Sequence, residues 1–86
     1  MFVIAIYDIH HKRVAKVHKT FKKYLHPIQK SVFEGEITES KINTLKEELL
    51  KIIHVTYDSI TIYCLESTKY TLKLQIGEVL QAQNVI

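Results

Sequence analysis

The chain has little of what marks secreted, disulfide-linked or membrane-spanning proteins. Among its 86 residues there is one cysteine, Cys64, so no internal disulfide can form. No apolar run approaches the roughly 18 residues needed to cross a membrane. The N-terminus also lacks the basic region that precedes a signal-peptide core. We therefore expect a cytoplasmic protein with no membrane partner. The chain holds only two glycines and one proline, which favours a compact domain rich in helices and strands.

Acidic residues are missing from a long stretch near the start of the chain. Between Asp8 and Glu34 there is no aspartate or glutamate, whereas more than half of the twelve Lys and Arg residues lie there. They are Lys12, Arg13, Lys16, Lys19, Lys22, Lys23 and Lys30. Such a concentration predicts a positively charged surface for an anionic partner. A solvated helix face is the alternative explanation of the same pattern.

The first strand is the most distinct element of the sequence. Phe2 to Tyr7 are consecutive residues that can be buried, which is typical of a strand covered on both faces. Asp8 follows where that strand should stop. A carboxylate at the end of a buried strand, followed at once by a basic segment, suggests a site for a metal ion and a polyanion. The alternative role for Asp8 is to cap the next helix.

Two amphipathic helices are predicted from the spacing of apolar residues. The first runs from about residue 11 to 25 and carries one apolar stripe, Val14, Val17, Phe21 and Leu25. Pro27 prevents that helix from continuing. Thr38 is a good N-cap for a second helix, which should end near His54.

Extended segments follow each predicted helix. Residues 28–37 form one bent strand or two short ones, with a bulge or bend at Gly35. Residues 60–65 form a strand whose apolar face should bury Cys64, and residues 71–76 alternate as a half-exposed strand does. This element order indicates an α+β fold with both helices on one face of a mainly antiparallel sheet. A second copy would cover the other face, so we predict a homodimer.

Several of these segments together resemble a known family. Tyr7-Asp8-Ile9 ends the first strand, and Gln29 begins the octet Gln-Lys-Ser-Val-Phe-Glu-Gly-Glu. Asp58-Ser59-Ile60-Thr61-Ile62-Tyr63 follows the second helix. From Met1 to about Tyr63 the chain is similar to the Cas2 family of CRISPR-associated proteins, small proteins of antiviral defence that take part in spacer acquisition. The octet, at this distance from the triplet, is the more specific part of the match.

The resemblance implies a ferredoxin-like fold and a homodimer. A single domain would span residues 1–86, with about 77–86 forming a C-terminal strand that pairs with the partner chain. In some members the resemblance implies metal-dependent endonuclease cleavage of RNA or DNA, with Mg²⁺ or Mn²⁺ as cofactor. A second family role is a dimeric scaffold that holds DNA between subunits of the CRISPR integrase.

The resemblance also assigns site residues. Asp8 corresponds to the metal-binding aspartate of the family. The positions around that site are matched by Tyr7, Arg13, Ser31 and Phe33, and Lys30 stands where a basic residue is frequent. The phosphate contacts of the scaffold role would come from Lys12, Arg13, Lys16 and Lys19. Two departures are Pro27, where the family often has arginine, and the pair His10-His11, which replaces a more polar turn.

The proposed chemistry needs more than one chain supplies. Mg²⁺ is commonly held by one or two carboxylates together with substrate phosphates, and Asp8 is the one acid near the site. A two-fold axis close to Asp8 would bring a second copy of that carboxylate. Arg13 and Lys30 would then stabilise charge on the phosphate, and His10 or His11 is a candidate proton shuttle.

Other functions remain open at this point. Tyr7 and Phe33 can stack on bases, although core packing is the commoner role of such residues. A nucleic-acid-binding module without catalysis needs no Asp8 at all. A ferredoxin-like regulator that binds a metabolite is the third possibility, and it ranks low because no glycine-rich phosphate loop is present.

Overall fold

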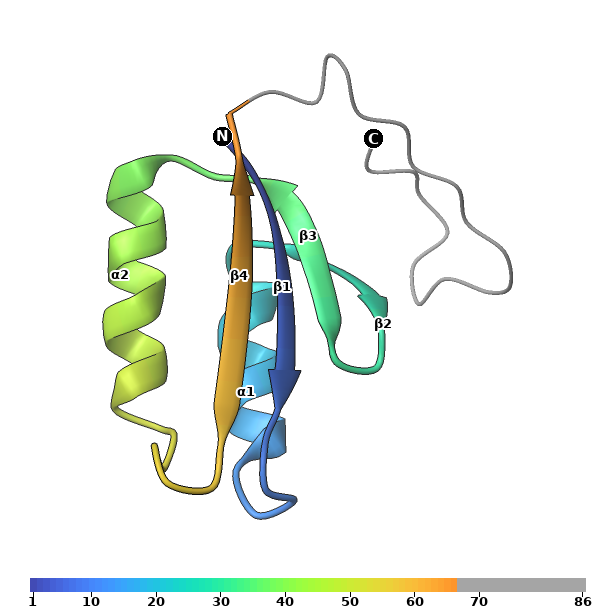
Figure 1. Ribbon diagram of the computed structural model, residues 1–86, viewed down its shortest axis with the longest axis vertical. Coiled ribbons are helices and arrows are strands. Elements are labelled where there is room, and N and C mark those ends of the chain that lie inside the picture. The colour runs from blue at the N-terminus through green and yellow to red at the C-terminus, as the bar shows by residue number, and fades with distance from the viewer. Residues whose placement is uncertain (67–86) are drawn as a thin grey trace.

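The computed structural model describes residues 1–66, which form a four-stranded antiparallel sheet and two helices (Figure 1). The strand order is β2-β3-β1-β4, and every neighbouring pair is antiparallel. The predicted α+β, ferredoxin-like architecture is therefore confirmed. The strand expected at 71–76 and the partner-pairing strand at about 77–86 lie outside the described residues. The elements are β1 (Phe2–Asp8), α1 (Val14–Lys22), β2 (His26–Gln29), β3 (Val32–Glu36), α2 (Glu39–Leu50) and β4 (Ser59–Leu65).

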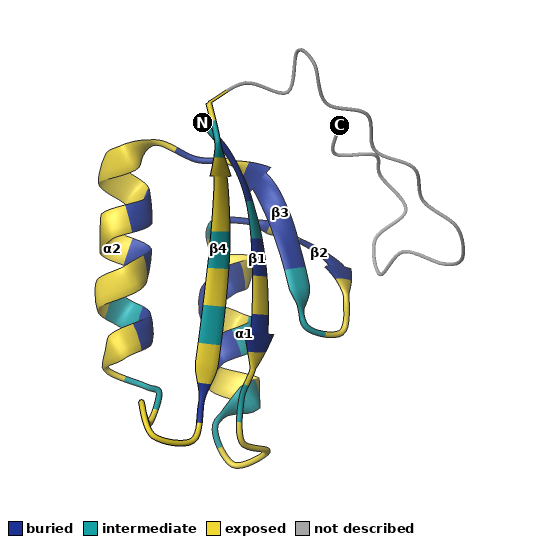
Figure 2. Ribbon diagram, in the orientation of Figure 1, coloured by how far each residue is buried: buried dark blue, intermediate teal, exposed yellow. Residues whose placement is uncertain are grey.

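Both helices cover one face of the sheet, as predicted. Side chains alternate along a strand, so Val3, Ala5 and Tyr7 of β1 all point to the same side. They form one core cluster with Phe33 of β3 and with apolar residues of α1 and α2, among them Val17, Phe21, Ile42, Leu45 and Leu49. In Figure 2 the buried residues of α2 lie on the side of the helix nearer the sheet.

Within residues 1–66, no helix covers the other face of the sheet, which we call the open face. Ile4, Ile6 and Asp8 alternate with the buried residues of β1 and therefore lie on this face. Ile6 is 42% exposed, and Tyr63, opposite Ile4 on β4, is also exposed. The expectation that β1 is covered on both faces therefore fails at Ile6 and Asp8 within the described residues, because α1 and α2 both pack on the other side.

The helix ends differ from the sequence prediction in detail. The chain from residue 11 to 13 is a turn, and α1 begins at Val14 with Arg13 as N-cap and no side-chain cap hydrogen bond. Asp8 therefore does not cap this helix. Thr38 caps α2 as predicted, because its Oγ1 accepts a hydrogen bond from the Lys41 N–H at 3.2 Å. Helix α2 ends at Leu50, before the predicted end at His54.

The extended segment around residue 30 is a hairpin of two short strands, β2 and β3. The register slips between Pro27 and Gln29, so the irregularity predicted at Gly35 lies at Ile28 instead. Proline has no N–H to give to the ladder, which explains a break beside it. Gly35 has a φ of 157°, and a Cβ there would come within 3.4 Å of Leu25 Cδ2. A larger residue at this position would strain the backbone and press against Leu25.

Strand β4 is the edge of the described sheet, and one prediction fails there. Cys64 lies opposite Val3 on the helix side of β4, but it is exposed and not buried. Helix α2 leaves an apolar groove of about 420 Å³ against β4, lined in part by Leu49, Ile62 and Cys64. No helix within residues 1–66 is both long enough and apolar enough to cross a membrane.

Candidate active site at the end of the first strand

The C-terminal end of β1 brings together several residues predicted for the site. Asp8 is exposed there and lies opposite Ser59 of β4. On the other side, the Tyr7 N–H donates to the Ser31 carbonyl at 3.0 Å. The turn that holds Lys30 and Ser31 therefore sits beside Asp8, at the lower end of the molecule in Figure 1. Asp8, Lys30 and Ser31 thus lie in one region of the fold.

A buried carboxylate joins the two loops at this end. The Asp58 side chain has no exposed surface. Its Oδ1 accepts from the His10 N–H at 2.9 Å and from Arg13 Nη2 at 3.0 Å. Its Oδ2 accepts from Arg13 Nε at 2.6 Å and from the His54 N–H at 2.8 Å. The loop between β1 and α1 is therefore fastened to the loop between α2 and β4 through one side chain.

Arg13 has a structural role that the sequence prediction did not assign. It is the sole arginine of the chain, and its planar guanidinium binds Asp58 through two nitrogens. The hydrogen bonds from Arg13, supported by those from the His10 and His54 N–H groups, hold the pKa of Asp58 far below its usual value. Arg13 was predicted to contact phosphate. In the structure two of its N–H groups donate to Asp58 instead, and this contact fixes the loop that follows Asp8.

Tyr7 fixes the turn on the other side of Asp8. Its hydroxyl donates to the Lys30 carbonyl at 3.0 Å and also lies 3.1 Å from His18 Nδ1. One hydroxyl proton cannot serve both partners, so His18 Nδ1–H donates to the tyrosine oxygen. Burial raises the pKa of Tyr7, and burial followed by the charge of Lys22 lowers the pKa of His18. Both groups are therefore neutral at pH 7.

Tyr7 and Phe33 belong to the core. The Tyr7 ring stacks on Phe21 with centroids 5.4 Å apart, and Phe33 stacks on Phe21 at 5.2 Å. Phe33 has no exposed surface. The interpretation of these two rings as core residues is correct for this chain. They act on the site by fixing β1, which ends at Asp8, and β3, which follows the turn that holds Ser31.

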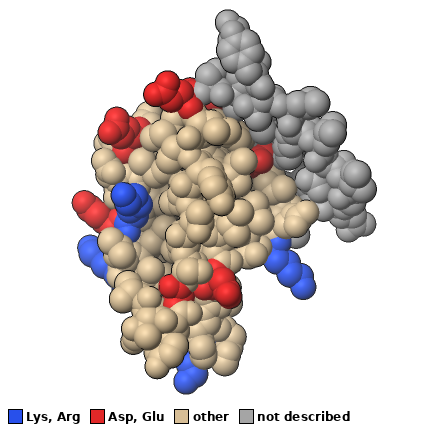
Figure 3. Space-filling model, in the orientation of Figure 1, with Lys and Arg blue, Asp and Glu red and all other residues tan. Residues whose placement is uncertain are grey.

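The basic helix lies on the other layer of the molecule. Lys16 and Lys19 are exposed on α1, which packs behind the sheet in Figure 1. Asp8, by its place in the alternation of β1, lies on the open face. Figure 3 shows mostly uncharged side chains over the strands on this face, with Lys and Arg at its margins. Lys12, in the loop after β1, is the predicted phosphate ligand nearest to Asp8 in the sequence. The cations and the acid therefore do not form one continuous surface on the sheet.

The donor set for a metal ion is small. Within residues 1–66, no three His, Cys, Asp or Glu side chains come together in a way that could hold a metal ion. Asp8 offers hard carboxylate oxygens from an exposed position, which suits Mg²⁺ that keeps most of its waters. One such ligand fits only if a second carboxylate or a substrate phosphate completes the site.

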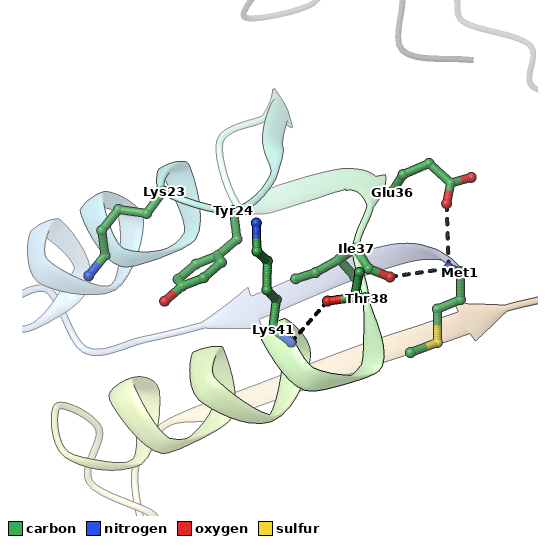
Figure 4. A pocket seen from close by; sticks show the side chains of 7 residues that line it. All are labelled: Met1, Lys23, Tyr24, Glu36, Ile37, Thr38 and Lys41. Carbon is green, nitrogen blue, oxygen red and sulfur yellow. Dashed lines mark hydrogen bonds and ion pairs between the residues drawn. The ribbon is translucent and has the colours of Figure 1, made fainter.

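A second hollow lies at the opposite end of the sheet (Figure 4). It has a volume of about 280 Å³ and lies between the end of α1 and the start of α2. Its polar groups are mostly bonded to each other or to Glu48. Lys23 and Tyr24 both donate to Glu48, and the Met1 amine pairs with Glu36 at 3.4 Å. Such a hollow offers little to a metabolite, so the regulator hypothesis gains no support.

Comparisons with known proteins decide the family. The family model described as CRISPR associated protein Cas2 matches residues 1–72. The chain belongs to the Cas2 family. A CRISPR-associated endoribonuclease Cas2 from Dictyoglomus turgidum is 46% identical over 77 residues, which cover 90% of this chain and 88% of that protein. A protein of the same description from Thermotoga maritima is 42% identical over 82 residues, covering 91% of this chain and 94% of the relative.

Solved Cas2 structures share the fold. One crystal structure of Cas2 superposes with a TM-score of 0.83 at 35% identity, covering 100% of this chain and 97% of the other. Streptococcus pyogenes Cas2, crystallised at pH 6.5, gives a TM-score of 0.76 at 30% identity, covering 90% of this chain and all of the other. The family and the fold inferred from the sequence are thus both confirmed.

Sequence reasoning missed the role of Asp58. The sequence places Asp58 at the start of a segment that resembles the family but assigns it no contact. One signal was available, because a single arginine among twelve basic residues points to a place where lysine will not serve. Pairing that arginine with Asp58 required the fold, since the two residues are 45 positions apart.

We expect Asp58→Asn to lower the urea midpoint of unfolding clearly. Each oxygen of Asp58 accepts two hydrogen bonds, so an amide NH₂ in either place would face two donors. The matched control is Glu47→Gln, which neutralises an exposed carboxylate and should change stability by no more than about 0.5 kcal/mol. Equal midpoints for the two variants would contradict the role of Asp58.

The stability difference between wild type and Asp58→Asn should also depend on pH. Because folding depresses the pKa of Asp58, its contribution is present above the unfolded value of about 3.9 and is lost as the pH falls below it. Urea unfolding at pH 7 and at successively lower pH checks this. A difference that grows on acidification would contradict the assignment.

Proposed function

We propose that this chain is a metal-dependent endonuclease of CRISPR spacer acquisition that cleaves RNA or DNA phosphodiester bonds. The observation that carries the proposal is Asp8, an exposed carboxylate at the end of β1 on the open face of the sheet. The endoribonuclease descriptions of the Dictyoglomus and Thermotoga relatives support the reaction class. A cytoplasmic location belongs to the same proposal, since that is where such substrates occur.

A homodimer is part of this proposal. The open face presents Ile6 and Tyr63 to solvent and half-buried Ile4 and Val32 around them. A second copy packed sheet to sheet would bury this apolar surface. Because Asp8 lies on the same face, a two-fold axis near the end of β1 would bring both copies of it together. The dimer would then supply the ligand that one chain lacks.

The residues of the chain divide the work at such a site. Asp8 from each copy would hold Mg²⁺ or Mn²⁺, which when bound neutralises phosphate charge and lowers the pKa of water. Lys30, exposed on the adjacent turn, would face the phosphate as a cation. The Ser31 carbonyl, which accepts from the Tyr7 N–H, would hold this turn beside Asp8. Arg13 would act through Asp58 by holding the loop that follows Asp8.

A second function is favoured by the location of the cations. Lys16 and Lys19 on the outer surface of α1 form a surface separate from Asp8, and Lys12 lies in the loop between the two. In a dimer, two such surfaces would hold a DNA duplex by its phosphates for a CRISPR integrase subunit. This scaffold role does not require Asp8, so the two functions are compatible and can be tested separately.

Cleavage should depend on Asp8 and on a divalent cation. We expect wild type to cut labelled single-stranded RNA or duplex DNA in Mg²⁺ and to stop when a chelator is added. Asp8→Asn should lower the rate by at least about 100-fold, since loss of a metal ligand costs no less than loss of an outer-shell partner. Rates are read from gel-resolved products at several enzyme concentrations.

The control for cleavage is Glu47→Gln, an exposed acid on α2 away from the site. It should cut at the wild-type rate. If Asp8→Asn cuts as fast as wild type, the activity comes from another site or from a contaminant, and the nuclease proposal fails.

The salt dependence of duplex binding tests the scaffold surface and the role of Arg13 together. Each lost phosphate contact lowers the log–log salt slope by about 0.9 on duplex DNA. Lys16→Ala and Lys19→Ala should each show such a loss, whereas Arg13→Gln, which removes the charge, should keep the slope because the guanidinium is engaged by Asp58. Unchanged slopes for the lysine variants would contradict this surface, and a lower slope for Arg13→Gln would show that Arg13 contacts phosphate.

A further inference from the structure

Two pairs of exposed rings lie on the two loops that Asp58 joins at the Asp8 end of the molecule. The imidazoles of His10 and His11 have centroids 4.3 Å apart and planes inclined by 31°. On the neighbouring loop, the His54 and Tyr57 rings are 4.9 Å apart and inclined by 44°. All four residues are exposed, and Tyr57 is 72% exposed. An exposed tyrosine ring at a loop tip contributes little to the core.

The backbones that carry the two ring pairs are held to one side chain. The backbone N–H groups of His10 and His54 bind the two oxygens of the one Asp58 carboxylate. Asp8 lies next to the same place, because it pairs with Ser59, the residue after Asp58. Both loops therefore meet the sheet next to the proposed catalytic carboxylate.

The loops that carry the rings are ordered by their own hydrogen bonds. The Lys12 N–H donates to His10 Nδ1 at 3.2 Å. The Tyr57 and Asp58 N–H groups both donate to the His54 carbonyl at 2.9 Å. A preformed arrangement of flat rings loses little conformational entropy when a planar ligand stacks on it. The rings are thus suited to a flat ligand, and Lys12 beside them favours an anionic one.

We propose that these four rings, the ring platform, bind the bases of single-stranded nucleic acid while its backbone passes Asp8. Aromatic and imidazole rings stack on any unpaired base, and a nearby cation follows the phosphates. Bases inside a duplex are already stacked and leave no face for the platform. The proposal rests on the proposed function for the role of Asp8, and it adds a site for unpaired bases on the two loops that Asp58 joins.

A tryptophan at position 57 reports the contact directly. The chain contains no tryptophan, so Tyr57→Trp introduces a single fluorophore into the platform. In chelator, where no cleavage occurs, a short mixed-sequence single-stranded RNA should quench its fluorescence. A strand of equal length with abasic ribose in place of every nucleotide keeps the phosphates and should quench far less. Equal quenching by the abasic strand, or by a duplex, would overturn the proposal.

Substitutions at Tyr57 separate stacking from apolar contact. Tyr57→Phe keeps the ring and should bind the single-stranded RNA as wild type does. Tyr57→Leu keeps an apolar side chain without a ring and should bind roughly 5- to 150-fold more weakly, as expected for one lost base stack. The control is Val55→Ala on the same loop, where a 74% exposed side chain has no ring and affinity should not change. Unchanged melting temperatures would exclude unfolding as the cause.

The outcomes distinguish this proposal from the nuclease proposal. If Asp8→Asn still binds in a base-dependent way and the wild-type protein never cleaves, the ring platform is supported and the nuclease proposal fails. If cleavage needs Asp8 but Tyr57→Leu binds and cuts like wild type, the nuclease proposal is supported and the ring platform fails.

Discussion

The carboxylate of Asp58 is the constraint on which this end of the molecule depends. It is fully buried, and its four hydrogen bonds come from two loops and from the sole arginine. A buried charge is tolerated only when it is paired and fully hydrogen-bonded. Movement of either loop would break hydrogen bonds to this carboxylate and is therefore unfavourable. The position of the residues after Asp8 follows from this requirement.

The layered fold then separates two kinds of surface. With both helices on one side of the sheet, the lysines of α1 lie on one layer and Asp8 on the other. The acid shares its face with Ile6 and Tyr63, which gives a second copy an apolar surface to cover. In this account the cations of α1 serve duplex binding, the paired acids serve the metal, and the loops joined by Asp58 serve unpaired bases.

Much of the fold could be predicted because it follows from local patterns. The apolar run of β1, the stripe of α1 and the Thr38 cap each specify their element from adjacent residues. The bulge at Ile28 and the exposure of Cys64 depend on pairing and on how far α2 reaches, which no local pattern contains. Asp8 and the turn at Lys30 could be proposed as site residues from local patterns and the family resemblance. The bond between Arg13 and Asp58 could not be predicted, because it joins residues 45 positions apart.

Hydrogen exchange at two backbone amides tests the central role of Asp58 most directly. The N–H groups of His10 and His54 both belong to surface loops, yet both donate to this buried carboxylate. The account predicts that both amides exchange slowly in the native protein and that Asp58→Asn raises both rates together. Exchange of either amide at the rate of an unstructured peptide in wild type would show that the carboxylate does not hold the two loops.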